Sequence, residues 1–140
     1  MSNTEQTLSI IKPDAVERNL DNEIKEMFKN KGFSIVKEKK IQIEKSEAEK
    51  FYKVHETKPF YNDLCAYLSS GPIVVMILEK GNAVLENREL MGATNPEDAE
   101  AGTIRKLYAE SIEANSVHGS DSNENAEIEI SFFFAGSELV

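Results

Sequence analysis

Apolar and polar residues follow regular patterns along most of the chain, and these patterns predict three strands at residues 8–12, 33–43 and 72–78. Residues 72–78 form an unbroken apolar run, which is typical of a central strand covered on both faces. In residues 33–43 the apolar positions alternate, but the middle of the segment, residues 37–40, is charged. That strand is therefore expected to lie partly exposed or at a sheet edge.

Helical spacing of apolar residues predicts the other main elements. The predicted helices cover residues 19–31, 46–54, 59–68, 83–90 and 123–134. Ser46 and Glu49 have the spacing of a capping box, and Ser122 is placed to cap the last helix. Asn95-Pro96 predicts the start of one further short helix within an otherwise polar segment.

Two side chains on these helices lie away from the apolar stripes. The stripe of the 59–68 helix consists of Tyr61, Leu64, Cys65 and Leu68. Phe60 lies about a quarter-turn from that stripe at about 100° per residue, so it is free to face something other than the core. Glu129 lies near the edge of the last stripe, where it can point back toward the preceding loop.

The order of elements predicts the fold. A short strand before the last helix completes the order βαββαβ, with inserted helices. This order is typical of an α+β sandwich of ferredoxin-like type, with a four-stranded antiparallel sheet. The sequence has no linker or internal repeat, so residues 1–140 are expected to form a single domain.

The composition indicates the class of protein and the compartment in which it is expected. Hydrophobic residues make up 40% of the chain and charged residues 29%, as in ordinary soluble domains. No apolar run reaches 18 residues, which excludes a membrane-spanning helix, and the N-terminus lacks a signal pattern. The single cysteine, Cys65, rules out an internal disulfide, and we expect a cytoplasmic protein.

The net charge of −9 counts against a nucleic-acid-binding surface but allows a small anionic ligand. The chain has no glycine-rich phosphate-binding motif and no histidine–cysteine cluster with metal spacing. A phosphate site would have to gather side chains from across the fold. Lys12, Arg88 and Arg105 lie beside structural breaks and are candidates, although each alone is typical of a solvated surface charge.

The segment from Asn115 to Ser122 contains the strongest candidate for chemistry. His118 is followed by Gly119 and by small polar residues, so a substrate can approach it closely. An imidazole is a good nucleophile near neutral pH and can carry a transferable group. A histidine in a loop is more often a surface or capping residue, so the segment alone does not decide the matter.

An ordered set of motifs resembles the nucleoside diphosphate kinase family across residues 7–134. The motifs are Ile11-Lys12-Pro13-Asp14-Ala15-Val16, Ser70-Gly71-Pro72, Arg88-x-x-Met91-Gly92-x-Thr94-x-Pro96, Gly102-Thr103-Ile104-Arg105 and Asn115-x-x-His118-Gly119-Ser120-Asp121-Ser122. The last motif is fairly specific by itself, and the ordered set is very specific.

The resemblance implies a reaction. His118 would attack the γ-phosphate of ATP or another nucleoside triphosphate through Nδ1 and would form a phosphohistidine. A nucleoside diphosphate would then take the phosphoryl group at the same site, in a ping-pong cycle that maintains NTP and dNTP pools. Glu129 matches the residue that accepts a hydrogen bond from the other imidazole nitrogen, and Lys12 is counted with these two as catalytic.

The resemblance also implies the nucleotide contacts. These residues are Lys12, Tyr52, Phe60, Leu64, Arg88, Thr94, Arg105, Ile112 and Asn115. Phe60 would stack on the base, which tolerates every base, while Leu64 and Ile112 would line the apolar side of the base slot or belong to the core. Mg²⁺ would be held mainly by the nucleotide phosphates, so no metal-ligand set is expected in the protein.

The family further implies a homo-oligomer, with a tetramer favoured over a hexamer or a dimer. One alternative is a catalytically silent nucleotide-binding module on the same fold, against which the full set of motif residues argues. A second is a nucleic-acid-binding α+β domain, against which the negative charge argues.

Overall fold

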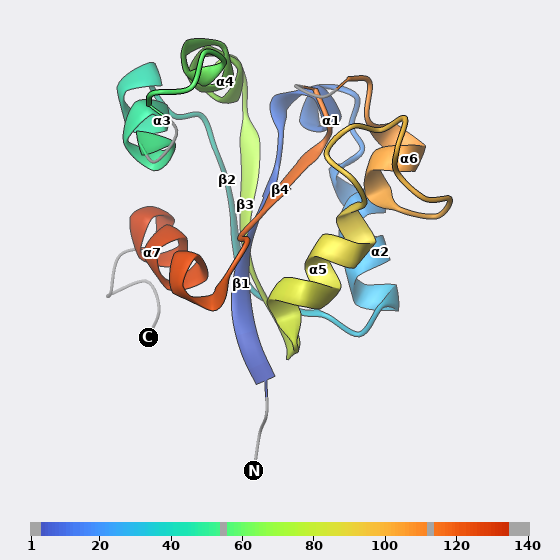
Figure 1. The fold of residues 1–140 in the computed structure, drawn as a ribbon. Coiled ribbons are helices and arrows are strands. Elements are labelled where there is room, and N and C mark those ends of the chain that lie inside the picture. Colours follow the sequence, from blue (N-terminus) through green and yellow to red (C-terminus); the bar gives the residue numbers. More distant parts are fainter. Residues whose placement is uncertain (1–3, 54–55, 112–113, 135–140) are drawn as a thin grey trace.

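The computed structural model describes residues 4–53, 56–111 and 114–134. Its sheet contains four strands, β1 (Thr4–Ile11), β2 (Ser34–Ile41), β3 (Ile73–Gly81) and β4 (Val117–Gly119). They lie in the order β2-β3-β1-β4, and each neighbouring pair is antiparallel (Figure 1). This arrangement confirms the predicted α+β ferredoxin-like class.

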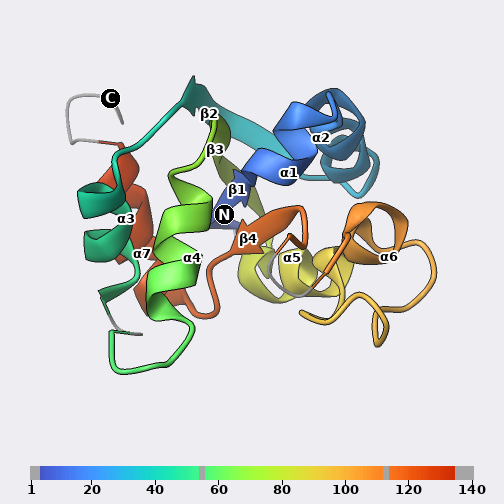
Figure 2. The ribbon, with the colours of Figure 1, turned by 90° about the horizontal axis from the view of Figure 1, so that it is seen from above.

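Helices cover both faces of the sheet. They are α1 (Pro13–Glu17), α2 (Asp21–Asn30), α3 (Lys45–Phe51), α4 (Tyr61–Leu68), α5 (Ala83–Met91), α6 (Ile104–Tyr108) and α7 (Asn123–Phe133). In Figure 1 the sheet is seen nearly edge-on, with α3, α4 and α7 on one side and α1, α2, α5 and α6 on the other. Figure 2 shows the same division from above.

The sheet separates two hydrophobic cores, and β3 contributes alternate residues to each. Val74 and Met76 pack with Phe28 on the α1–α2–α5–α6 side. Val75 and Ile77 pack on the α3–α4–α7 side. The prediction that residues 72–78 form a central strand covered on both faces is therefore confirmed.

Several predicted boundaries are wrong. The capping box of α3 pairs Glu44 with Glu47 rather than Ser46 with Glu49, and Glu44 N–H donates to Glu47 Oε1 at 3.1 Å. Glu44 has the extended backbone that an N-cap requires, whereas Ser46 is already helical. The chain also forms a separate short helix, α1, before α2, and β1 begins at Thr4.

No helix begins at Asn95 among the described residues. Asn95 forms a turn instead, in which its Oδ1 accepts the N–H of Glu97 at 3.0 Å. The helix of this region is α6, which is capped by Thr103 through a hydrogen bond from the N–H of Lys106. Asn side chains favour such local turns when no apolar stripe follows to bury a helix.

None of the helices in the described ranges has the length and apolar character needed to cross a lipid bilayer.

Candidate active site

His118 lies in the middle of β4, the three-residue strand at one edge of the sheet, opposite Ile10 of β1. The next residue, Gly119, lies beneath α5. A Cβ at this position would overlap the side-chain amide of Asn87 and come within 2.7 Å of Met91 Cε. The absence of a side chain at Gly119 therefore lets α5 pack directly against the strand that carries His118.

Glu129 of α7 fixes the orientation of the His118 ring. His118 Nε2 lies 3.0 Å from Glu129 Oε1, and Ser120 Oγ donates to the same carboxylate oxygen at 2.9 Å. Ser122 caps α7 by accepting the N–H of Asn125 at 3.1 Å. A carboxylate at Nε2 favours the tautomer with its proton on that nitrogen, which leaves the lone pair on Nδ1.

Aromatic rings form a wall beside the imidazole. The ring centroids of Phe51 and His118 are 5.3 Å apart, with the ring planes inclined by 74°. Tyr52 makes a second edge contact with His118 at 6.3 Å, and Phe133 packs on Phe51. These contacts restrict the ring and bury one side of it in apolar surroundings.

A cavity of about 1360 Å³ opens in front of His118. The predicted site residues that line it are Lys12, Tyr52, Phe60, Leu64, Arg88, Thr94, Arg105, Asn115 and His118. Glu129 is not among the lining residues and is bonded to His118. Ile112 lies outside the described residues.

Arg105 is held rigidly at the cavity wall. Its guanidinium donates to the carbonyl oxygens of Gly92 and Val117, each at 2.9 Å. Burial, followed by repulsion from Arg88, lowers the pKa of Arg105 to about 10. The guanidinium therefore remains charged at neutral pH, and an anion in the cavity would stabilise it.

Lys12 and Asn115 form a second polar group in the cavity wall. Lys12 Nζ donates to Asn115 Oδ1 at 2.8 Å, and Asn115 Nδ2 donates to the carbonyl oxygen of Thr94 at 3.3 Å.

Tyr52 also lines the cavity. Burial, with smaller contributions from Cys65 and Glu129, raises the pKa of Tyr52 well above its ordinary value. The Tyr52 hydroxyl is therefore a neutral donor in this cavity.

The cavity also has an apolar part. Phe60, just before α4, is 49% exposed, in agreement with its predicted position away from the buried stripe. Leu64, one turn later, lines the cavity and also packs against the core. An exposed aromatic ring beside an aliphatic side chain suits a planar aromatic ligand.

Sequence reasoning missed several residues of this region. Ser120 shares the Glu129 oxygen with His118, and Gly92 supplies a carbonyl oxygen to Arg105. Met91, Thr103 and Asp121 line the cavity. All five belong to the motifs that carry the resemblance, so their place in those motifs was the available signal.

Acidic and histidine side chains do not form a metal-binding cluster in the described parts of the chain.

The fold and the site together define a class of protein. A histidine whose Nε2 contacts a carboxylate lines a cavity together with the buried cations Lys12 and Arg105 and the aromatic ring of Phe60. This is the arrangement of a protein that binds a phosphorylated aromatic ligand and presents a nucleophile to it.

Comparison with known proteins gives the family. Residues 5–139 match the family model described as nucleoside diphosphate kinase. The nucleoside diphosphate kinases of Granulibacter bethesdensis and a Nitratiruptor species are each 60% identical over 136 residues, which is 97% of this chain and 97% and 99% of theirs. The chain belongs to the nucleoside diphosphate kinase family.

Solved structures agree with this assignment. An orthorhombic crystal form of the Aquifex aeolicus nucleoside diphosphate kinase superposes with a TM-score of 0.95 at 38% identity, covering 98% of this chain and 99% of that one. The apo Encephalitozoon cuniculi nucleoside diphosphate kinase gives a TM-score of 0.89 at 34% identity, and the match covers 97% of this chain and 99% of that one.

Proposed function

We propose that this protein transfers the γ-phosphate of ATP or another nucleoside triphosphate to nucleoside diphosphates, with His118 as the phosphoryl carrier. Family membership supports the reaction class. The observation in this chain that supports the carrier is the 3.0 Å contact between His118 Nε2 and Glu129, at the wall of a cavity that Lys12, Arg88 and Arg105 also line.

The first half-reaction begins with the lone pair on His118 Nδ1. It attacks the γ-phosphorus, a nitrogen–phosphorus bond forms, and the bond from phosphorus to the β–γ bridging oxygen breaks. The nucleoside diphosphate leaves with that electron pair. The ring becomes positively charged while Nε2 keeps its proton, and the Glu129 carboxylate stabilises this charge.

The second half-reaction reverses these steps with another nucleoside diphosphate. A terminal phosphate oxygen of the acceptor attacks the phosphorus, and the bond to Nδ1 breaks. Because both nucleotides use one cavity, the donor's product must leave before the acceptor binds. This sequence is a ping-pong cycle with a covalent intermediate.

In this proposal, cationic and polar side chains bind the phosphates of the nucleotide. Lys12, Arg88 and Arg105 meet the negative charge that develops on the phosphate oxygens, because phosphoryl transfer depends chiefly on positioning and charge. Thr94 and Tyr52 supply neutral donors, and Asn115 and Lys12 reach the sugar hydroxyl region. The base stacks on Phe60 with Leu64 beside it, so all bases are accepted, and the family resemblance alone assigns Ile112 to the same slot.

Mg²⁺ is part of the proposal as the partner of the nucleotide phosphates. It would neutralise phosphate charge and would be held mainly by the nucleotide phosphates, as the family resemblance implies. Asp121 is the carboxylate of the His118 motif that lines the cavity, and it is of the oxygen type that Mg²⁺ prefers.

The protein is further proposed to be a cytoplasmic homo-oligomer, with a tetramer favoured over a hexamer or a dimer. Family resemblance supports this assembly. Strand β2 at the edge of the sheet, with Val36 exposed, offers surface for contacts between copies. Membrane and nucleic acid are not proposed as partners.

Incubation with γ-labelled ATP and no acceptor tests the function. The protein should gain an acid-labile, base-stable label, and added nucleoside diphosphate should remove it. His118→Ala should abolish labelling, while His55→Ala, which changes the only other histidine, should label like the parent. Label on serine, or labelling of the His118 variant, would refute the proposed carrier.

Steady-state kinetics gives an independent check of the cycle. Reciprocal plots at several acceptor concentrations should be parallel, as a ping-pong mechanism requires. Intersecting plots would indicate direct transfer in a ternary complex. Nucleotide binding without any labelling would instead identify a catalytically silent module.

A further inference from the structure

We propose that Asp14 is a positioning residue for this site, because its buried carboxylate holds the turn at Ser116 that connects Asn115 to the strand of His118. The inference rests on the proposed function of His118. It adds a residue that neither faces the cavity nor contacts the imidazole.

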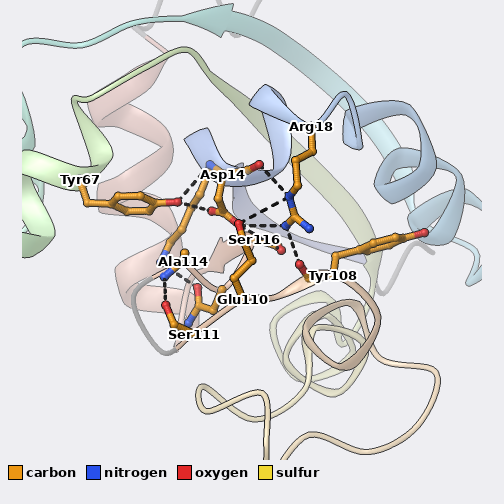
Figure 3. Close-up of polar contacts among 10 residues, drawn as sticks. Asp14, Arg18, Tyr67, Tyr108, Glu110, Ser111, Ala114 and Ser116 are labelled. Carbon is orange, nitrogen blue, oxygen red and sulfur yellow. Dashed lines mark hydrogen bonds and ion pairs between the residues drawn. The ribbon is translucent and has the colours of Figure 1, made fainter.

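Asp14 is 7% exposed and uses both carboxylate oxygens (Figure 3). Oδ1 accepts the hydroxyl of Tyr67 at 2.6 Å, and Oδ2 accepts the hydroxyl of Ser116 at 3.3 Å. Arg18 Nη2 lies 3.4 Å from Oδ2 and balances the charge. The carboxylate therefore joins α1, α4 and the segment before β4.

The turn held by Asp14 has an unfavourable backbone conformation. Ser116 has φ +74°, in the left-handed region that favours glycine, and its side chain is fully buried. The N–H of Val117 donates to the carbonyl oxygen of Asn115 at 2.9 Å, which closes a three-residue turn around Ser116. Such strain persists only where surrounding contacts impose it, and it is concentrated at functional sites.

This turn lies between the residues that the reaction needs. The N–H of Lys12 donates to the carbonyl oxygen of Ser116 at 2.8 Å, and Lys12 Nζ bonds Asn115. On the other side of the turn, the carbonyl oxygen of Val117 accepts from Arg105, and His118 follows. Relaxation of the turn would therefore shift Asn115 and β4 relative to Lys12 and Arg105.

Arg18 extends the same network to the segment after α6. It donates from Nη2 to the carbonyl oxygen of Tyr108, and its Nε lies 3.7 Å from Glu110 Oε1. Figure 3 shows these partners grouped around Asp14. The network thus fixes both ends of the connection between α6 and β4.

Three variants test whether the hydrogen bonds of Asp14 position the site around His118 or only stabilise the fold. Ser116→Ala removes only the hydroxyl that bonds Asp14, and Asp14→Asn removes the charge and one acceptor site. Tyr67→Phe is the control, because it removes the hydroxyl that bonds the other carboxylate oxygen and the N–H of Asp14 and leaves the hydrogen bonds of Ser116 in place. Each would be studied as the full chain, at a temperature where circular dichroism shows it fully folded.

The main readout is the rate of His118 phosphorylation in a single turnover at saturating γ-labelled ATP. Ser116→Ala and Asp14→Asn should slow it about 10- to 100-fold, the effect expected when reacting groups shift by a fraction of an ångström to one ångström. Tyr67→Phe should lower the urea midpoint and keep the parent rate. The Asp14→Asn/Ser116→Ala double variant should be no slower than the slower single variant, since both changes break the same hydrogen bond, the one from the Ser116 hydroxyl to Asp14.

Parent-like rates in both Asp14→Asn and Ser116→Ala would overturn the inference and assign the network to stability alone. Multiplied defects in the double variant, or an equal defect in Tyr67→Phe, would also overturn it, because the turn would not be the point of action. A parent protein that forms no phosphohistidine would refute the proposed function instead, so the two failures are distinct.

Discussion

Glu129 contacts the imidazole of His118 at Nε2, 3.0 Å from its Oε1 atom. This contact favours the tautomer with its proton on Nε2, and Ser120 keeps the carboxylate in place by donating to the same oxygen. The direction of the ring thus depends on two polar side chains beyond the cavity surface.

Glu129→Gln should slow phosphorylation of His118 about 10- to 100-fold, since an amide can still accept the Nε2 proton but does not stabilise the positive ring as well. Glu127→Gln, on an exposed position of the same helix, is the control and should keep the parent rate. Quenched-flow labelling with γ-labelled ATP measures both. Equal rates in the parent and Glu129→Gln would show that the carboxylate charge is not used.

At the scale of the elements, the loop after α5 depends on a glycine. Gly92 ends α5 with φ +87°, and a Cβ there would lie 2.6 Å from Thr103 Oγ1. Gly102 has a similar φ of +86°, but a Cβ there would meet no atom within 4 Å. The two positions therefore share a backbone preference and differ in crowding.

Gly92→Ala should lower the free energy of unfolding by about 2–5 kcal/mol, the sum of the left-handed backbone penalty and the steric overlap. Gly102→Ala should cost only about 1–2 kcal/mol. Urea denaturation measures both. Gly92→Ala should also reduce activity, because Gly92 supplies a carbonyl oxygen to Arg105; equal stability losses in the two variants would show that crowding at Gly92 relaxes without cost.

Elements with strong periodicity could be predicted from the sequence, and short ones could not. The apolar run of β3 and the stripe of α7 are each long enough to show their pattern. Helix α1 has only five residues and is partly held by Asp14, whose N–H donates to the hydroxyl of Tyr67 at 3.0 Å. A contact between residues 53 positions apart leaves no local signal.

In the candidate site, too, some residues could be predicted from the sequence and others could not. Arg88 and Arg105 look like ordinary surface charges when read singly, and only the ordered motifs brought them together. The offset of Phe60 from its stripe was readable and agrees with its exposure. The roles of Ser120 and Ser116 depend on hydrogen bonds between distant elements, which spacing along the chain does not encode.

For the whole molecule, the main electrostatic feature is that three cations, Lys12, Arg88 and Arg105, line one cavity of a chain whose net charge is −9. Four carboxylates line the same cavity, those of Glu89, Asp98, Glu100 and Asp121. Burial and repulsion from Arg88 lower the pKa of Arg105 from its ordinary value to about 10 in the folded state. From pH 10 up to that ordinary value the unfolded state binds more protons, so stability rises with pH there. Below pH 10 the charged guanidinium destabilises the empty protein, and a bound anion would offset this.

Arg88→Met should therefore keep or raise the free energy of unfolding without nucleotide, because it removes a repulsion on Arg105. Nucleoside triphosphate binding should weaken about 10- to 100-fold, as expected when one charge-assisted hydrogen bond is lost. Urea denaturation and calorimetric titration measure these effects. Lys106→Met, the same charge change at an exposed residue, is the control; a matching loss of affinity there would point to net charge alone.

The central strand β1 pairs with β4, and Lys12 at the end of β1 meets Asn115, 103 residues later. Glu129 comes later still. A growing polypeptide therefore cannot bring these side chains together before its last helix, α7, has been synthesised. During refolding, phosphorylation of His118 should return no earlier than the docking of α7, which labelling at successive refolding times would check.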